Sequence, residues 1–334
     1  MQFKKHYFDE YVFVAPGSDY GRAMWSDIAR MDNAVLLDAP LRKTNRFISL
    51  LHHAHFSFAI NRKIQLPFQH IWKRLYATEQ LQWDASKYYC VIYTDVSAAR
   101  TDHTYLRALR QRGNITMALV MVNTMARRGS LIESRRDCFD YAFTFDRKDA
   151  ERYGMIYHPS SYSMVAMEPD VEITEDAFYV GVSKGRAKLL AQIYDKLTKG
   201  GAAASFTING MKRGEARCPG IRYNEWMEYS DVLRHIRACN CIVEVMDAAQ
   251  EGVTLRTMEA ICYNKKLLTN NPAMRESRYY STGFIQVFEK PEDIDVDFVR
   301  RKEAVNYGYD GEFSPVRLIE RIEEIVERDR LTVE

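Results

Sequence analysis

Short apolar runs alternate with longer segments of helical pattern along the 334-residue chain, and this alternation constrains the fold most strongly. In the first half the runs are YVFVAP (11–16), AVLLD (34–38), YYCVIYTD (88–95), ITMALVMVN (115–123) and YAFTFD (141–146). Their length and continuous apolar character are typical of buried strands, and Leu106 and Leu109 lie at helical spacing between the third run and the fourth. Repeated strand, helix, strand units predict a parallel sheet covered by helices.

The alternation pauses over residues 153–176, which contain two prolines and an acidic cluster, and then resumes. The later runs are AFYVGVS (177–183), ASFTING (204–210), CIVEVM (241–246), KLLTNN (266–271) and FIQVF (284–288). We therefore expect an interdomain boundary near residue 170, with one domain over 1–170 and a second over 171–334 that includes an amphipathic terminal helix at 317–331. The predicted fold class is α/β, with two doubly wound, Rossmann-like domains facing each other across a cleft.

Composition excludes several classes of protein. Forty-seven basic and 45 acidic residues leave a net charge of +2, which does not resemble the one-sided charge of a dedicated nucleic-acid binder. Six cysteines without CxxC pairing predict reduced, buried thiols rather than a disulfide framework or a metal site. The N-terminal residues lack a long apolar segment, and no run approaches the ~20 apolar residues that span a bilayer. We expect a cytoplasmic protein.

The segment EGVTLRTME (251–259) follows the run CIVEVM and opens a helix. Ligands of open parallel sheets collect at the carboxyl ends of strands, where Gln250, Glu251 and Gly252 fall. Gly252 permits close backbone approach, Thr254 is a candidate helix cap or hydroxyl donor, and the amides of a helix start favour phosphate.

Two charged residues of this helix are further candidates. Glu259 lies eight residues after Glu251, so both fall on roughly one side, and its carboxylate can accept two hydrogen bonds from a vicinal diol such as a ribose. Arg256 either faces the phosphates of the ligand or forms a salt bridge at the protein surface. The alternative for Glu259 is an exposed position on an amphipathic helix.

These residues resemble the E-x7-E signature of retaining GT-B glycosyltransferases, and more narrowly bacterial capsule and lipopolysaccharide glycosyltransferases. The resemblance covers about 177–290 and includes YVGVSKGR (179–186) and KLLTNNP (266–272). It implies transfer of a sugar from a nucleotide-sugar, most simply a UDP-sugar, to a surface glycan or lipid-linked glycan. It also implies retention of the donor's anomeric configuration, with Glu251 holding donor hydroxyls and Glu259 binding the ribose.

The loop VGVSKGR joins a strand to a helix start. Its Gly181, Ser183, Lys184 and Arg186 offer two cations and free amides for a diphosphate, which the resemblance makes the leaving group. Lys184 and Arg186 are thus catalytic candidates with Glu251, and no divalent metal or other cofactor is expected. The alternative is an ordinary solvated helix start.

Other candidates are less constrained by the sequence. Asn209, at a strand end, can border the nucleotide. Asp95 and Asp19 can reach the cleft from the acceptor side, although each residue is also typical of a helix cap or turn. The departing phosphate can take the acceptor proton, so no separate base is required.

Residues 42–76 interleave Arg, Lys and His with Phe, Trp and Leu. The favoured interpretation is an amphipathic helix pair with a solvated basic face. The alternative is peripheral docking on the inner face of an anionic membrane that presents the acceptor. His52, His53 and His55 lack the acidic or cysteine partners of a metal site.

Two other functions are considered. A dinucleotide-dependent oxidoreductase is disfavoured because no GxGxxG follows an early strand. A non-catalytic nucleotide-sugar sensor or scaffold of the same fold stays open, since fold does not fix function.

Overall fold

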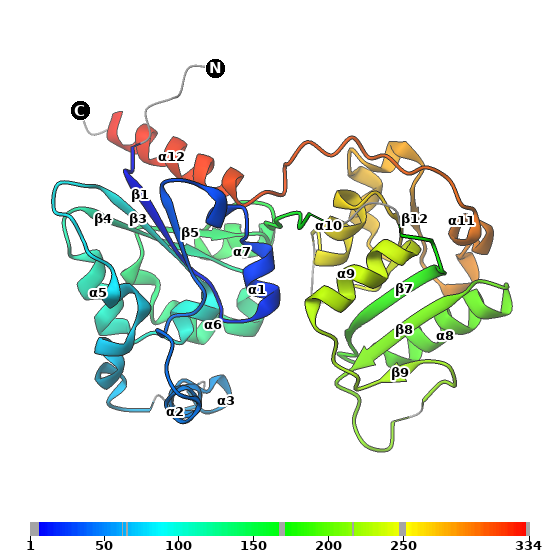
Figure 1. Cartoon of the computed structure of the whole chain (residues 1–334), viewed down its shortest axis with the longest axis horizontal. Coiled ribbons are helices and arrows are strands. Elements are labelled where there is room, and N and C mark those ends of the chain that lie inside the picture. The colour runs from blue at the N-terminus through cyan, green and yellow to red at the C-terminus, as the bar shows by residue number, and fades with distance from the viewer. Residues whose placement is uncertain are drawn as a thin grey trace. The chain divides into compact units, whose positions relative to one another are not determined.

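The computed structural model describes residues 7–61, 63–64, 66–166, 171–215, 217–246 and 252–331, except for the side chains of Asp19, Arg127, Arg128 and Ser130. Contacts divide the chain into two units, shown in Figure 1. The first contains residues 1–163 and 313–334, and the second contains residues 164–312. Each unit is built on its own six-stranded sheet.

The first unit has the strand order β2-β1-β3-β4-β5-β6, and every neighbouring pair is parallel. The strands are β1 (Glu10–Val14), β2 (Ala34–Leu37), β3 (Tyr89–Thr94), β4 (Ile115–Val120), β5 (Tyr141–Thr144) and β6 (Ile156–Tyr157). The α-helices are α1 (Asp19–Met24), α2 (Arg46–His55), α3 (Phe58–Asn61), α4 (Asp95–Ala99), α5 (His103–Arg110), α6 (Met125–Glu133), α7 (Arg147–Tyr153) and α12 (Val316–Leu331). Short 3-10 helices are η1 (Ile28–Arg30), η2 (Gln69–Leu75), η3 (Ala77–Gln80) and η4 (Arg136–Cys138).

The second unit has the order β12-β11-β10-β7-β8-β9, again parallel throughout. The strands are β7 (Glu175–Val182), β8 (Ala204–Asn209), β9 (Arg222–Tyr223), β10 (Cys239–Glu244), β11 (Lys266–Thr269) and β12 (Ile285–Val287). The α-helices are α8 (Ala187–Lys199), α9 (Tyr229–Ala238), α10 (Leu255–Cys262) and α11 (Val296–Arg300). The 3-10 helices are η5 (Pro272–Glu276), η6 (Tyr280–Thr282) and η7 (Pro291–Asp293).

The predicted α/β class with two doubly wound parallel sheets is confirmed. All six residues of β3 and all six of β10 are buried, as the continuous apolar runs predict for strands covered on both faces. The two-residue strands β6 and β9 lie at sheet edges and were not predicted, because two residues give no periodic signal.

The terminal helix α12 belongs to the first unit, so its predicted place in the second domain is wrong. Glu323 accepts hydrogen bonds from the backbone N–H groups of Tyr7 and Phe8 and from the Tyr11 hydroxyl, and Figure 1 shows α12 beside β1. Amphipathicity predicts that a helix packs on some core, but it does not say on which one. The expected boundary at residue 170 lies outside the described residues; the contact-based division falls after Ser163.

We expect Glu323→Ala to lower the free energy of unfolding of the first unit by about 2 kcal/mol, because three donors lose a carboxylate acceptor. Thermal unfolding followed by tryptophan fluorescence measures this change, since Trp25, Trp72 and Trp83 all lie in that unit. Glu324→Ala is the control, because exposed Glu324 pairs only with Arg321 among the contacts described for it. Equal effects of the two substitutions would contradict the anchoring role.

Candidate functional site

The second sheet has a topological switch point between β7 and β10. The chain proceeds from β7 to β8 and β9 on one side, and from β10 to β11 and β12 on the other. The connections diverge where these two strands end, at the carboxyl edge of the sheet. Open α/β sheets bind their ligands at this position.

The turn from β7 into α8 lies at this switch point. Lys184 and Gly185 both have positive φ, at 44° and 83°, and Lys184 is exposed. Arg186 is the N-cap residue of α8, and within the described chain its side chain makes no capping hydrogen bond. A 13-residue helix therefore starts at the carboxyl edge of the sheet with its positive dipole end directed at this turn.

Arg186 joins the ends of β7 and β10. Its guanidinium donates hydrogen bonds to the carbonyl oxygens of Val182, Ser183 and Val245. Carbonyl groups at diverging strand ends lack ladder partners, and Arg186 satisfies three of them. Its predicted role with the diphosphate stays a prediction, and in this conformation the guanidinium is directed at backbone oxygens.

Asn209 ends β8 beside Val182 and is 3% exposed. Its Oδ1 atom is buried and has no hydrogen-bond partner among the described residues. A buried polar atom without a partner is costly, and a ligand donor removes that cost. Gly181 lies two residues after Tyr179, and a Cβ at Gly181 would stand 2.8 Å from the Tyr179 hydroxyl oxygen, so this position accepts no side chain without rearrangement.

Glu244 organises the start of α10 and was not identified from the sequence. Its buried carboxylate accepts hydrogen bonds from the hydroxyls of Thr254, Thr257 and Thr269. Thr254 is the N-cap of α10 and accepts from the backbone N–H of Arg256. The available signal was an acidic residue inside the apolar run CIVEVM, which requires a polar partner when buried.

Gly252 is held against the carboxyl end of β11. Asn271 Nδ2 donates to the Gly252 carbonyl oxygen at 3.0 Å, and Gly252 has a φ of 104°, which favours glycine. Gln250 and the predicted catalytic residue Glu251 lie outside the described residues, so their assigned roles stay predictions.

Glu259 is 0% exposed rather than at the surface. Its carboxylate accepts a hydrogen bond from Tyr229 Oη at 2.9 Å and pairs with Arg256. Burial raises the pKa of Glu259, while Arg256 and Tyr229 oppose that shift. Arg256 thus forms a largely buried ion pair, and a ribose diol at Glu259 would share the carboxylate with these two partners.

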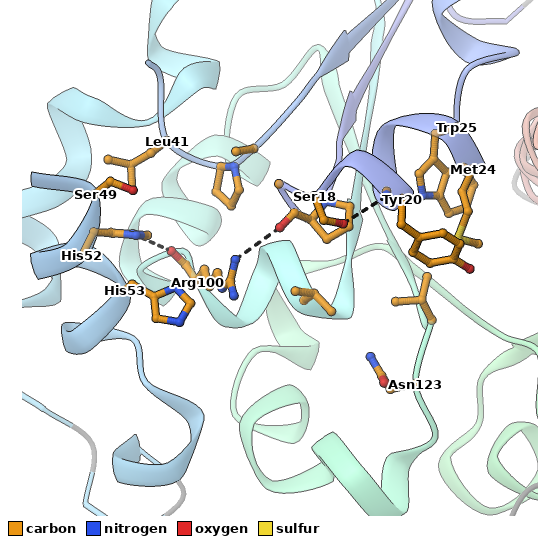
Figure 2. A pocket seen from close by; sticks show the side chains of 17 residues that line it. Ser18, Tyr20, Met24, Trp25, Leu41, Ser49, His52, His53, Arg100 and Asn123 are labelled. Atoms are coloured by element: carbon orange, nitrogen blue, oxygen red, sulfur yellow. Dashed lines mark hydrogen bonds between the residues drawn. The ribbon is translucent and has the colours of Figure 1, made fainter. Parts of the chain in front are cut away.

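The first unit carries a cavity of about 620 Å³ at its own switch point, between β1 and β3. Figure 2 shows the lining, which combines apolar side chains such as Met24, Trp25 and Leu41 with the polar side chains of Tyr20 and Asn123. The volume lies in the range of small-molecule sites.

Arg100 and His52 shape one wall of this cavity (Figure 2). Arg100 Nη1 donates to the Pro16 carbonyl oxygen at 3.2 Å, which links the segments that follow β1 and β3. His52 Nε2 lies 3.0 Å from the Arg100 carbonyl oxygen. Burial lowers the pKa of His52 to about 3, so the imidazole is neutral and Nε2–H is the donor.

Asp95 bonds to the segment that follows β4 and is not itself among the residues that line the cavity. Its carboxylate accepts from the backbone N–H of Val122 and from Asn123 Nδ2, both at 2.9 Å, and it is fully buried. It therefore positions Asn123, which lines the cavity, and its direct contact with an acceptor stays a prediction. The side chain of Asp19, the other acceptor-side candidate, is outside the described part of the structure.

The described residues include no group of three or more His, Cys, Asp or Glu side chains placed to hold a metal ion. All six cysteines are free thiols, and five of them are buried. In the described part of the chain, no helix has the length and apolar character needed to cross a bilayer.

The raised pKa of Glu259 predicts a pH dependence of stability. The folded protein holds this proton more tightly than the unfolded chain does, so the carboxyl stabilises the fold below its unfolded pKa near 4.5. That contribution is lost as pH rises through the folded pKa. We expect the free energy of unfolding of Glu259→Gln to fall less than that of the wild-type protein when pH is raised above about 4.5. Urea unfolding at several pH values measures this difference.

Glu276→Gln, at an exposed position of the same unit, is the matched control and keeps the wild-type pH dependence. A wild-type slope in Glu259→Gln would show that this carboxyl takes up no proton on folding.

Comparisons with known proteins give structural likeness only. No family model matches the chain, and no curated protein sequence matches it. A putative UDP-N-acetylglucosamine 2-epimerase from Listeria monocytogenes matches with a TM-score of 0.49 and 10% identity, over 96% of this chain and 97% of that one.

Two transferase structures are also similar. A spinosyn forosaminyltransferase matches with a TM-score of 0.41 and 12% identity, over 98% of this chain and 100% of its own. A T4 phage BGT variant in complex with UDP-glucose matches with a TM-score of 0.45 and 11% identity, over 87% of this chain and 88% of that one. At these identities and scores the likeness does not establish an activity.

Proposed function

We propose that this protein is a GT-B glycosyltransferase that moves a sugar from a UDP-sugar to a surface glycan acceptor of the capsule or lipopolysaccharide type. The observation that carries the proposal is the switch point of the second sheet. There the left-handed turn at Lys184 and Gly185 and the start of α8 lie beside Asn209, at the ends of adjacent strands β7 and β8. The Oδ1 atom of Asn209 has no hydrogen-bond partner among the residues that the structure describes. Helix amides and a cation suit a diphosphate, and a buried carbonyl oxygen suits a ligand N–H or O–H.

The chemistry required of such a site is stabilisation of a leaving group. An acceptor hydroxyl oxygen bonds to the anomeric carbon, the bond from that carbon to the diphosphate oxygen breaks, and the acceptor proton passes to the departing phosphate. Lys184 and the α8 amides favour the charge that develops on the diphosphate. Arg186 holds the ends of β7 and β10 in register, which keeps these donors in place.

The cavity of the first unit is proposed as the acceptor site. Trp25 and Met24 supply apolar surface for a sugar ring face, while Tyr20 and Asn123 offer hydrogen bonds to hydroxyls. Asp95 fixes Asn123 for this contact. Neutral His52 orients the wall without adding charge. The proposed reaction needs no divalent metal and takes place on the cytoplasmic side of the membrane.

Calorimetry with UDP tests the donor site. We expect Asn209→Ala to weaken UDP binding about tenfold, or ~1.4 kcal/mol, because the ligand donor then loses its acceptor. Asn306→Ala, at an exposed position in the same unit, is the control and leaves affinity unchanged. Absence of UDP binding to the wild-type protein would contradict the proposed function, and binding without release of UDP from UDP-sugars would favour the scaffold alternative.

The product is expected to keep the anomeric configuration of the donor sugar. The warrant is the E-x7-E resemblance at Glu251 and Glu259. Proton NMR of the first-formed product measures the configuration. An inverted product would require a base that accepts the hydroxyl proton, and would contradict this assignment.

A further inference from the structure

Large apolar side chains are concentrated on the outer surface of residues 47–71, in the first unit. Within the described residues of this segment they are Phe47, Leu50, Leu51, Ile60, Ile64, Phe68 and Ile71, with exposures from 45% to 71%. Single exposed apolar residues are ordinary, but so many within one short segment mark an interaction site. We call these seven residues the apolar surface.

Helix α2 presents its apolar residues to solvent. Phe47, Leu50 and Leu51 follow the i, i+3, i+4 spacing of one helix face and are 68%, 65% and 47% exposed. The opposite face, with Ser49 and His52, lines the cavity proposed for the acceptor. The helix therefore separates that cavity from an outward apolar stripe.

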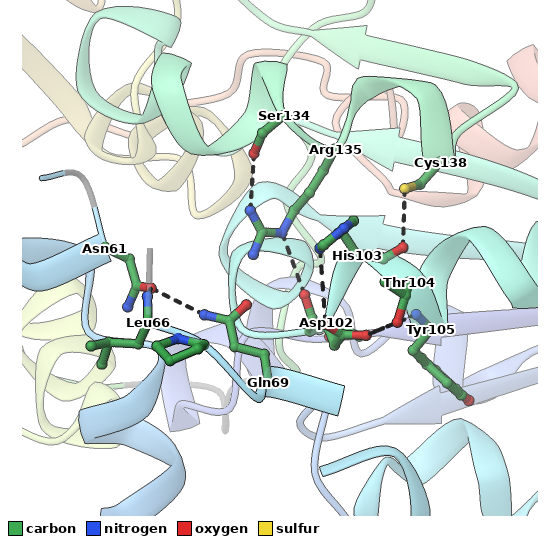
Figure 3. A network of polar contacts seen from close by, with 12 residues as sticks. Asn61, Leu66, Gln69, Asp102, His103, Thr104, Tyr105, Ser134, Arg135 and Cys138 are labelled. Atoms are coloured by element: carbon green, nitrogen blue, oxygen red, sulfur yellow. Dashed lines mark hydrogen bonds and ion pairs between the residues drawn. The ribbon is translucent and has the colours of Figure 1, made fainter. Parts of the chain in front are cut away.

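The apolar surface rests on a rigid polar support. Asn61 Nδ2 donates to the carbonyl oxygens of His55 and Ser57, and Asn61 Oδ1 accepts from Leu66 N and Gln69 Nε2. These bonds tie α2, α3 and η2 together, and Gln69 lines a shared hollow with Asp102, His103 and Thr104 (Figure 3). The exposed side chains are thus held on a fixed scaffold.

Two hydrogen bonds of the His55 imidazole add to this support. Trp72 Nε1 donates to His55 Nδ1 at 2.9 Å, and His55 Nε2 lies 2.8 Å from the Pro67 carbonyl oxygen. The next residue, Phe68, has a φ of 62° and a side chain that is 68% exposed. A bulky residue rarely adopts this conformation, which persists where the surroundings impose it, so the support holds Phe68 outward.

The charged side chains around the apolar surface are all basic. Between Asp38 and Glu79 the sequence contains no Asp or Glu, while its cations are Arg42, Lys43, Arg46, Arg62, Lys63, Lys73 and Arg74. Except for Arg62, which is not described, all of these cations are exposed. The whole chain has nearly balanced charge, so this stretch is a local cationic region around the apolar surface.

We infer that the apolar surface docks on an anionic lipid bilayer, with its side chains at the level of the headgroups and upper acyl chains and the surrounding cations on lipid phosphates. Aliphatic side chains such as Leu50, Ile64 and Ile71 gain free energy in hydrocarbon but have little to offer a nucleic acid. A second copy of the same surface would bring like charges together, which disfavours self-association through it. Apolar side chains ringed by Lys and Arg match the two signals that peripheral membrane binding requires.

Docking of this kind places α2 between the bilayer and the acceptor cavity. An acceptor anchored in the membrane by a lipid could then present its head group to Tyr20, Trp25 and Asn123. This refinement of the acceptor class rests on the proposed function, whereas docking itself does not.

Co-sedimentation with lipid vesicles tests the inference. We expect the full chain to sediment with vesicles of phosphatidylcholine containing about one-third phosphatidylglycerol, and at least about tenfold less with phosphatidylcholine alone. Added salt lowers the anionic component of binding. Failure of the wild-type chain to bind the anionic vesicles at low salt would overturn the inference.

Two double variants separate the apolar and ionic contributions. Leu50→Ser with Ile64→Ser keeps the charge and is expected to lower partitioning at least about tenfold. The double variant Lys63→Gln, Lys73→Gln is expected to lower partitioning onto anionic vesicles by about 25-fold, because each lost cation lowers it by about fivefold. Trp226→Ser, at a 75% exposed position in the second unit, is the control and stays within about twofold of wild type.

Unchanged thermal unfolding shows that a variant is folded, and UDP calorimetry reports separately on the donor site. Loss of UDP binding with intact sedimentation would therefore contradict the proposed function but not the docking. Retained sedimentation in the Leu50 and Ile64 variant would overturn the docking inference. Two other results would also overturn the docking inference. If the variant binds a DNA duplex as well as it binds anionic vesicles, the surface is a nucleic-acid site. If the wild-type chain is a dimer that the substitutions dissociate, the surface contacts a second copy of the chain.

Discussion

The divergence of parallel strands at a switch point is the constraint on which both candidate sites depend. Each sheet reverses its order of connection at one place, β1 and β3 in the first unit and β7 and β10 in the second. The backbone groups exposed there need partners, and an arginine supplies hydrogen bonds in both units. Arg100 donates to Pro16, and Arg186 donates to Val182, Ser183 and Val245. These hydrogen bonds fix the backbone at both switch points.

Buried carboxylates make the carboxyl edge of the second sheet rigid. Glu244 gathers three threonine hydroxyls from α10, its N-cap and β11, and Glu259 joins α10 to α9 through Tyr229. Buried charges and polar groups are stable only with such complete sets of partners. Their effect is to hold the start of α10 at the carboxyl edge of the sheet, where Asn271 also holds Gly252. A preorganised edge of this kind suits electrostatic stabilisation of a leaving group.

Helix α2 connects the proposed acceptor cavity to the proposed membrane surface. Its buried face carries His52, whose neutral imidazole bonds to the Arg100 carbonyl oxygen, and its outer face carries Phe47, Leu50 and Leu51. An amphipathic helix with apolar residues outward is unfavourable in water unless another surface covers them. The sequence pattern of residues 42–76 favoured an amphipathic helix pair with a solvated basic face, and the proposal of membrane docking rests on the exposed fractions of the apolar side chains.

The sequence by itself determined the α/β class, the strands of both sheets except the two-residue β6 and β9, and the position of the Lys184 and Glu259 segments after strands, because hydrophobic periodicity is a local property. It did not determine that Glu259 is buried against Tyr229 and Arg256, that Arg186 bonds to strand ends, that Asp95 supports Asn123, or that Glu244 collects threonines. It also placed α12 with the wrong unit. These features depend on contacts between residues far apart in the chain, and only the tertiary structure decides which long-range partners meet a given polar group or apolar face.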